Sequence, residues 1–291
     1  MTAANATRIV AVTGATGRQG GAVTRHLLTA GWRVRAITRS PDSVRARQLV
    51  ELGADVVKAD MDDLATLLPA FHQVYGVYSV QNPMISGHDG EIAQGINVAD
   101  AALEAGARHL VYGSAGIGVV GTGVDSWESK LIIHGYMRNI GLPVTALRPM
   151  AFLELMTDKS YYPAVSTWHV MPKLMGAERP VPWLSVDDLG AIAARVFADP
   201  ARFIGAELCL AADVRTLREC AEIWREVKGR APRRFPMPTW LFERMTGTDL
   251  TTMWRWLRTG RFDFDTAETL RLLPEAASVR TWLSARQPQR T

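Results

Sequence analysis

The chain has 291 residues, of which 47% are hydrophobic and 21% are charged, close to the proportions of ordinary soluble globular proteins. This composition excludes a disordered tail, a collagen-like fibre and a coiled-coil rod. The formal net charge is +4, and the residues from Asp213 onward contribute 15 Lys and Arg against 10 Asp and Glu. These cations are scattered among apolar residues without a long basic run, so we expect no nucleic-acid partner.

Neither the first residues nor any internal run suggests a membrane span or an export signal. No apolar run reaches the length of about 18 residues that a membrane span needs, and residues 1–8 lack the order of a signal peptide. We therefore expect a cytoplasmic protein without a membrane partner. Cys209 and Cys220 form neither a disulfide framework nor a metal-ligand spacing, so both are expected in the core and no metal site is expected.

Strand-length apolar runs alternate with helical patterns along the first 150 residues. The expected strands span residues 9–13, 33–38, 55–58, 74–80, 110–113 and 144–147, and the expected helices begin near residue 20 and cover residues 91–105 and 129–139. Alternation at this spacing predicts parallel strands joined by right-handed crossovers. The expected fold class is α/β, a doubly wound Rossmann-like parallel sheet.

The pattern changes after Arg148, where prolines interrupt the chain. Residues 186–198 and 216–228 are expected to be helices, and the second has Thr216 and Glu219 at capping-box spacing. We expect a first domain at residues 1–150 and a smaller mixed α/β substrate lobe with C-terminal helices at residues 151–291, which adds late strands to the sheet. A single integrated domain is the alternative.

A glycine-rich turn between the first strand and the first helix carries the strongest chemical signal. It reads GATGRQGG from Gly14 to Gly21, with the spacing GxxGxxG. Glycines let the backbone turn tightly and approach a pyrophosphate, and a helix N-terminus offers N–H groups to an anion. The turn therefore predicts dinucleotide binding by the domain at residues 1–150.

The end of the second strand indicates which dinucleotide. NAD sites commonly place an acidic residue about 20 residues past the turn, where it binds the ribose 2′-hydroxyl. This chain instead has Arg39 and Ser40 there, and Arg18 lies in the first turn of the helix. A guanidinium matches the oxygens of a 2′-phosphate, so NADP(H) is the expected cofactor.

Several segments together resemble the NmrA-like family, atypical relatives of the short-chain dehydrogenases/reductases on a Rossmann fold. They are GATGRQGGAV, VRAITRSP, GADVVKADMDD, KLIIHGYMRNIGLPVTALRPMAFLE and PWLSVDDLGAIAA. The resemblance runs from about Arg8 to the end of the chain. That family contains NADP(H)-sensing regulators without evident catalysis as well as quinone, azo-type and phenylpropanoid reductases, so the resemblance implies fold and cofactor more sharply than activity.

The resemblance also implies roles for individual residues. Its pyrophosphate ligands would be Gly14, Thr16, Gly17, Gln19 and Gly20, with Arg39 at the 2′-phosphate and Asp60 and Met61 beside the adenine. The ribose and nicotinamide would be lined by Val80, Gln81, Asn82 and Pro83, with Lys130 at the nicotinamide ribose and residues 149–152, from Pro149 to Phe152, over the nicotinamide face.

The chain departs from the usual pattern of these dehydrogenases around Lys130. Many of them carry a Tyr four residues before this lysine, and its phenol exchanges the substrate proton. Here that position is Ser126. Lys130 is then either the proton donor or only a cofactor clamp, and His134, one helical turn further, is a second candidate acid or a packed histidine. Ser114, after the fifth strand, is a candidate hydrogen-bond partner of the substrate or a small residue required by crowding.

Two functions remain open from the sequence. One is an NADPH-dependent reductase of a small aromatic, quinone-like or conjugated substrate, for which hydride transfer matters more than acid catalysis. The other is a non-catalytic NADP(H) sensor that binds a partner protein or a second copy of itself. For the sensor, Trp254 and Trp256 would form the contact patch, unless they are buried in the core. We favour the reductase.

Overall fold

The computed structural model describes residues 5–158, 166–260, 262 and 264–286. The chain divides into two units, each of which we describe separately. Unit 1 comprises residues 1–118, 129–148 and 186–208, and unit 2 comprises residues 119–128, 149–185 and 209–291. The chain therefore leaves unit 1 three times, after residues 118, 148 and 208, and returns to it twice.

A seven-stranded sheet forms the centre of unit 1, with the strand order β3-β2-β1-β4-β5-β6-β9. The strands are β1 Ile9–Val12, β2 Arg33–Thr38, β3 Asp55–Lys58, β4 Gly76–Ser79, β5 His109–Gly113, β6 Val144–Pro149 and β9 Glu207–Leu210. The pairs from β3 to β6 are parallel. The order reverses between β1 and β4, and such a switch point is where open α/β sheets bind ligands, at the carboxyl ends of the strands.

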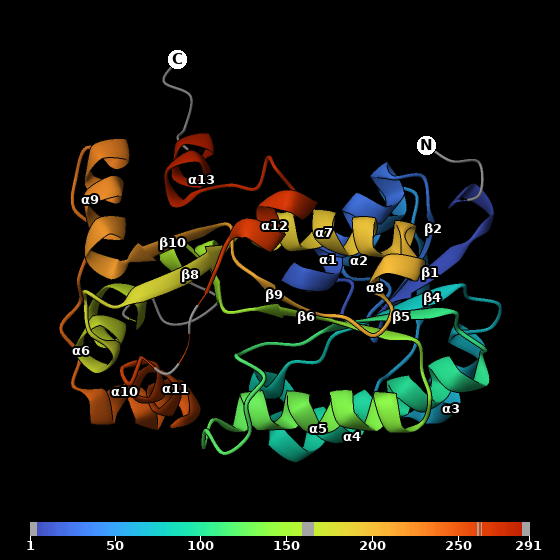
Figure 1. The fold of residues 1–291 in the computed structure, drawn as a ribbon. Helices are drawn as coiled ribbons and strands as arrows, with labels where there is room; N and C mark the ends of the chain where they lie inside the picture. The colour runs from blue at the N-terminus through green and yellow to red at the C-terminus, as the bar shows by residue number, and fades with distance from the viewer. Residues whose placement is uncertain (1–4, 159–165, 261, 263, 287–291) are drawn as a thin grey trace. The chain divides into compact units, whose positions relative to one another are not determined.

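Helices cover both faces of this sheet (Figure 1). They are α1 Arg18–Thr29, α2 Val44–Glu51, α3 Leu64–Ala70, α4 Pro83–Glu104, α5 Asp125–Asn139, α7 Val186–Ala198 and α8 Pro200–Phe203. Helices α3, α4 and α5 lie on one face, and α1, α2 and α7 lie on the other. Helix α7 packs against α1 so closely that a Cβ on Gly190 would lie 2.7 Å from the backbone carbon of Ala22. The expected doubly wound α/β class is confirmed.

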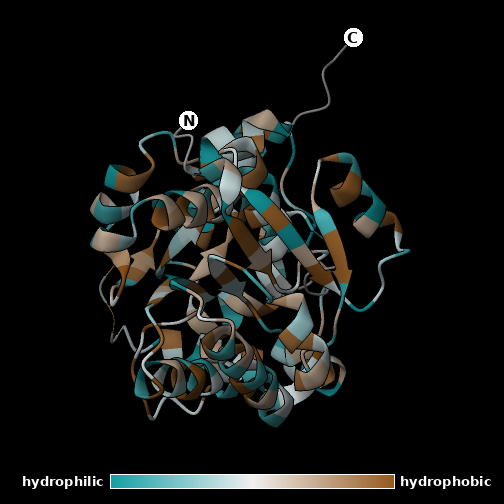
Figure 2. Cartoon of the chain, turned by 90° about the vertical axis from the view of Figure 1, so that its right-hand side faces the viewer, coloured by the Kyte–Doolittle hydropathy of each residue, from teal (hydrophilic) through white to brown (hydrophobic). Residues whose placement is uncertain are grey.

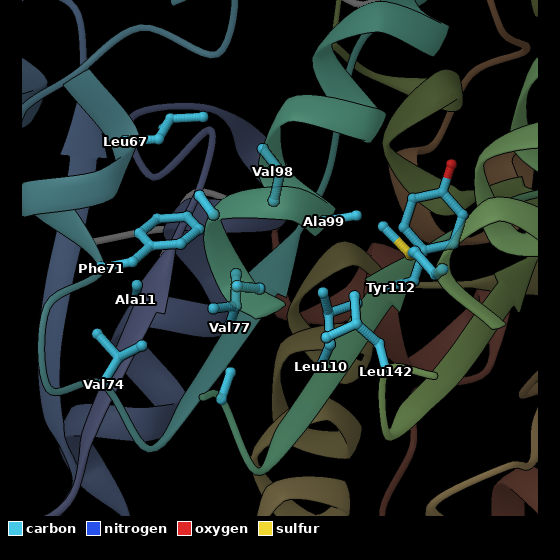
Figure 3. Packing of buried hydrophobic residues seen from close by; sticks show 14 of the residues in the cluster. Ala11, Leu67, Phe71, Val74, Val77, Val98, Ala99, Leu110, Tyr112 and Leu142 are labelled. Atoms are coloured by element: carbon cyan, nitrogen blue, oxygen red, sulfur yellow. The ribbon is translucent and has the colours of Figure 1, made fainter. Parts of the chain in front are cut away.

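The apolar core under α3, α4 and α5 positions the strands β4 and β5. Val77, Leu110 and Tyr112 from these strands pack with Val98 and with Phe71, and all five are fully buried (Figure 3). Some strands are mostly hydrophobic and others alternate between hydrophobic and hydrophilic residues, as the helices also do (Figure 2). The hydroxyl of Tyr112 points from this core toward the helices.

Two helices of unit 1 begin earlier than the sequence pattern predicts. Helix α4 starts at Pro83 rather than at residue 91, because Asn82 caps it by accepting from Met84 N (3.0 Å) and Pro83 suits a first helical position. Gly87, at φ 75°, interrupts this helix and hides the early turn from a periodicity count. Helix α5 starts at Asp125 rather than at residue 129.

Unit 2 contains its own three-stranded sheet, with the order β10-β8-β7. Its strands and helices are β7 Ala151–Phe152, β8 Pro180–Leu184, β10 Asp213–Thr216, α6 Met171–Met175, α9 Leu217–Lys228, α10 Thr239–Thr246, α11 Asp249–Leu257, α12 Ala267–Leu272 and α13 Val279–Ala285, with short helical segments at Leu153–Met156 and Ser166–Val170. The capping box of α9, formed by Thr216 and Glu219, is present as expected.

One expectation for the late residues needs correction. Cys220 is buried but Cys209 is exposed, because alternate residues of a half-buried strand such as β9 face outward. Of the two tryptophans for which the sequence left core or contact patch open, Trp254, at 5% exposure, is buried in the core and Trp256 is half-buried. Among the residues that the structure describes, no helix combines the length and the hydropathy of a membrane span.

Candidate functional site

The glycine-rich turn connects β1 to α1 at the switch point of the sheet. Gly14 adopts φ +58°, which favours glycine, and the N–H of Gly17 donates to the carbonyl of Gly14 (2.8 Å). Gly17 caps α1 without a side chain, so no side-chain oxygen occupies the N–H groups of the first helical turn. A Cβ on Gly20 would lie 2.3 Å from the oxygen of Gly14, so Gly20 is required by the turn itself. The turn can therefore present backbone donors to a pyrophosphate.

A partly buried hydrogen bond connects this turn to the neighbouring strand. The hydroxyl of Tyr78, in β4, donates to Oε1 of Gln19 (3.3 Å), and burial raises the pKa of Tyr78. A Cβ on Gly113, at the end of β5, would lie 2.8 Å from the same hydroxyl. Thr13 adds a second connection, since its Oγ1 accepts from Val80 N (2.9 Å). The ends of β1, β4 and β5 are thus held at fixed spacing.

Arg39 and Ser40 are exposed at the end of β2, where a 2′-phosphate group would be recognised. Arg39 makes no hydrogen bond or ion pair with another described residue. Nearby, Nη1 of Arg45 donates to the carbonyl of Thr16 in the glycine-rich turn (3.3 Å). The sequence analysis missed Arg45, although its place in the first turn of the helix after β2 was a usable signal.

The residues expected beside the adenine and the ribose lie at the ends of β3 and β4. Nε2 of Gln81 donates to Ser79 Oγ (2.9 Å) and lies 3.8 Å from Met61 Sδ. Nδ2 of Asn97 donates to the backbone carbonyl of Met61 (2.9 Å). The Asp60 carboxylate accepts from the backbone N–H of residue 62 (3.1 Å) and shapes its own turn. Asn82 and Pro83 begin α4, which gives both a local structural role.

Lys130 lies in α5, where its ammonium contacts the Glu91 carboxylate of α4. Ser129 Oγ donates to the other oxygen of the same carboxylate. Glu91 is 0% exposed and Lys130 is 7% exposed, so this is a buried ion pair. The sequence analysis did not single out Glu91, because its partners lie 38 and 39 residues away.

A second polar group lies beneath α5. His134 stacks on the Tyr112 ring (centroids 6.4 Å apart), and its Nδ1 lies 3.7 Å from Oε1 of Glu207. Glu207 is also paired with the buried Arg148. The two expected candidates, Lys130 and His134, thus share a helix but have different ionic partners.

The protonation of this group follows from its burial. Burial lowers the pKa of His134, and Glu207 opposes this shift. The guanidinium groups of Arg148 and Arg138 add to the lowering. Burial and then the Glu91 carboxylate raise the pKa of Tyr112 well above its ordinary value. At neutral pH the imidazole is therefore mostly neutral and the phenol keeps its proton.

Four buried polar atoms at the carboxyl ends of β4, β5 and β6 have no hydrogen-bond partner among the described residues. They are Gln81 Oε1, Tyr112 Oη, Ser114 Oγ and Arg148 Nε. Ser114 is 1% exposed, so its hydroxyl is withdrawn from bulk water. Unsatisfied buried polar groups are rare in proteins, and a bound ligand or an ordered water is a common reason for them. These atoms fit a site that a polar ligand completes.

Two expected cofactor-binding residues, Pro149 and Phe152, fall in unit 2. Pro149 ends β6 and is buried, and Phe152, in β7, pairs with Leu184 of β8. Phe152 is thus fixed by strand pairing within unit 2. Their proposed place over the nicotinamide remains a prediction.

Comparison with known proteins identifies relatives along nearly the whole chain. The model of the NmrA-like family matches residues 6–276. The chain is 33% identical over 261 residues to the NmrA-like family domain-containing oxidoreductase FrzB of Cladobotryum sp, which covers 80% of this chain and 78% of that protein. It is 29% identical over 302 residues to the corresponding oxidoreductase malD of Malbranchea aurantiaca, covering 91% and 89%.

Solved structures share the fold at lower identity. NmrA, a negative transcriptional regulator crystallised with NADP, superposes with a TM-score of 0.78 at 19% identity, covering 97% of this chain and 95% of that one. The triphenylmethane reductase of Citrobacter sp., complexed with NADP(H), gives 0.77 at 20% identity, covering 96% and 99%. The resemblance in the sequence is thereby confirmed, and the chain belongs to the NmrA-like family.

Proposed function

We propose that this chain is an NADP(H)-dependent oxidoreductase that acts on a small aromatic, quinone-like or conjugated substrate. The observation that carries the proposal is the glycine-rich turn at the switch point, which leaves the first N–H groups of α1 uncapped beside buried polar atoms without partners. Curated relatives are named oxidoreductases, and structural neighbours include a triphenylmethane reductase and an NADPH-dependent quinone oxidoreductase of Escherichia coli.

The cofactor assignment rests on the two ends of this site. The turn from Gly14 to Gly20 would hold the pyrophosphate through backbone N–H groups, and Arg39 with Ser40 would hold the 2′-phosphate. A bound NADPH supplies a hydride from its nicotinamide ring. Lys130 would bind the nicotinamide ribose, and the unpaired Oγ of Ser114 would accept or donate a hydrogen bond to the substrate oxygen.

The substrate class follows from the missing phenol. Ser126 stands where a Tyr would relay the proton, and an alcohol hydroxyl at that position is too weak an acid for this task. His134 is mostly neutral, so only a small fraction of the protein carries an imidazolium that could donate a proton. Quinone-like and conjugated acceptors take up protons from water readily once reduced, so they suit this site better than simple ketones.

A non-catalytic NADP(H) sensor is the second candidate, because Ser126 removes the usual acid and NmrA itself is named a regulator. In that case a partner protein or a second copy of the chain would bind according to cofactor occupancy. Trp254 is buried, as the alternative of a core position predicts, and Trp256 is half-buried, so the two offer little contact surface. The exposed aromatic residues Phe235 and Trp240 of unit 2 are the remaining candidates for contact.

Calorimetric titration with NADPH and NADH, followed by a substrate panel, tests the proposal. We expect tight NADPH binding and NADPH consumption with at least one quinone, azo dye, imine or conjugated carbonyl. NADPH binding without consumption across the panel, together with cofactor-dependent association with a partner protein, would support the sensor instead. Absence of binding to either cofactor would refute both.

A further inference from the structure

Glu91 holds the ammonium of Lys130 and the hydroxyl of Ser129 from one fully buried carboxylate. Each carboxylate oxygen takes one of these two donors. The Ser129 hydroxyl has a single proton, which it donates to Glu91, whereas an ammonium has three N–H donors. Lys130 makes no other hydrogen bond to a described residue. Two of its donors therefore remain for a ligand, a number that matches the two hydroxyls of a ribose.

The pair also restricts what Lys130 can do with its proton. A buried carboxylate is tolerated when it is paired, and removing the opposite charge leaves a strongly unfavourable isolated charge. If Lys130 gave its proton to a substrate, Glu91 would become such an isolated charge. Among the described residues, the Ser129 hydroxyl is the one other group that donates a hydrogen bond to it. The contact thus favours a lysine that stays charged.

Glu91 is not needed to hold α4 against α5. Further along the same helices, Tyr136 Oη donates to Asp100 Oδ1 (2.6 Å). A Cβ on Gly95 would lie 2.6 Å from Ile133 Cγ2, so the helices also touch through close apolar packing. A purely structural explanation of a buried charge at Glu91 is therefore weak, since apolar residues of similar volume often replace buried ion pairs without loss of stability.

We propose that Glu91 is the positioning residue of the site, which aims the Lys130 ammonium at the nicotinamide ribose and keeps it charged, so that Lys130 is a cofactor clamp and the reaction takes its proton elsewhere. This inference rests on the proposed function. It chooses between the two roles that the sequence left open for Lys130, and it adds Glu91, through its contact with Lys130, to the residues that determine cofactor affinity.

A double-mutant cycle measured by NADPH titration tests the role. Glu91→Gln keeps the size but removes the charge, and we expect the Kd for NADPH to rise at least about tenfold, the scale of a hydrogen bond to a charged group. Lys130→Met should raise the Kd by a similar factor or more. Because Glu91 acts through Lys130, adding Glu91→Gln to Lys130→Met should change the Kd little further.

Tyr136→Phe is the matched control, because it removes a polar contact between the same two helices outside the site. Its Kd for NADPH should equal that of the wild type. Lys130→Arg is the second diagnostic variant, since guanidinium stays charged and does not give up a proton. Retained NADPH turnover in Lys130→Arg supports the clamp, and turnover lost with NADPH affinity retained would identify Lys130 as the proton donor and overturn the proposal.

Other outcomes separate the inference from the proposed function. Unchanged NADPH affinity in a folded Glu91→Gln variant, or a penalty that persists in full on the Lys130→Met background, would refute the positioning role alone. If Glu91→Gln does not fold, Glu91→Asp retains the charge on a shorter side chain and should bind NADPH more weakly than the wild type. Wild-type affinity in Glu91→Asp would then contradict the proposal. A wild-type chain that binds neither cofactor would refute the function itself.

Discussion

The two sides of the candidate site are built in different ways. The side at β1, β2 and α1 consists of backbone N–H groups and exposed cations, with Gly17 and Arg39 open to solvent. The side at α4 and α5 consists of buried side chains, with Glu91 and Lys130 paired away from water. The first side suits an anion that arrives with its own charge, and the second suits neutral hydroxyls or a reacting oxygen, because only there is water excluded. The predictions below test this contrast.

The largest effect is expected at the glycine-rich turn. Gly17→Val adds a side chain whose Cβ would lie 3.0 Å from the Gly14 oxygen, where the pyrophosphate would approach. We expect NADPH binding to be lost at accessible concentrations in a calorimetric titration. A circular dichroism spectrum is the control for folding, and normal affinity in the folded variant would show that the turn is only structural.

A buried histidine outside the site gives the next largest effect, on stability. His109, at the start of β5, is 0% exposed and contacts Thr145 Oγ1 (2.8 Å), and burial lowers its pKa from 6.5 to about 4. Below pH 6.5 the unfolded chain binds a proton that the native imidazole does not bind, so the free energy of unfolding decreases as the pH is lowered. Between the two pKa values the loss amounts to about 3 kcal/mol.

Denaturant unfolding of the wild type and of His109→Gln at a series of pH values measures this difference. The variant should lose the part of the acid sensitivity that lies between pH 6.5 and about 4. If the free energy of unfolding depends on pH in the same way in both proteins, native His109 takes up its proton at the same pH as in the unfolded chain, which would contradict the prediction. The measurement sharpens the contrast by showing how burial changes the pKa of a basic group that has no ionic partner among the described residues.

The exposed side is tested by Arg39→Ala. We expect the wild type to bind NADPH more tightly than NADH by about 1.5–3 kcal/mol, which is about 10- to 150-fold in Kd. The variant should lose most of this preference, with little change for NADH. Arg45→Ala, measured in parallel, tells whether the neighbouring guanidinium shares the task. Equal affinities of the wild type for both cofactors would remove Arg39 from the 2′-phosphate site.

The smallest effect is expected at His134. Since its pKa lies below 6.5, the imidazole is mostly neutral at pH 7 and His134→Ala should lower turnover by less than about tenfold. A fall of about 100-fold would instead make His134 the proton donor. In that case the wild-type rate should decline as pH rises through the lowered pKa, because the protonated form is then lost. A pH–rate profile distinguishes the two.

The same contrast explains which parts could be predicted from the sequence. The turn at Gly14 and the helix Val186–Ala198 depend on residues that are neighbours in the chain, so glycine spacing and apolar periodicity were sufficient. Arg39 could be located at the end of the second strand because its distance from the turn is fixed by one strand and one helix, and its contact with a 2′-phosphate stays a prediction. Local rules of this kind also gave the α/β class.

Pairings between distant segments were not visible in the same way. Glu91 and Lys130 are 39 residues apart, and Arg148 meets Glu207 at a separation of 59. On the expected helix at residues 91–105, Glu91 looks like an ordinary residue of the solvent-exposed polar face, because a single sequence gives no sign that a carboxylate is buried. The strand order, and the separate sheet of β7, β8 and β10, likewise follow from long-range packing.

The close packing of α7 on α1 has a consequence for how the protein is made. Helix α1 is covered by Val186–Ala198, and the sheet is completed at its edge by β9, which begins at Glu207. Unit 1 therefore cannot fold completely until more than two thirds of the chain has left the ribosome. Synthesis proceeds at about 5–20 residues per second. Until then the apolar face of α1 stays open to chaperones, and we expect a fragment ending at residue 150 to aggregate rather than fold.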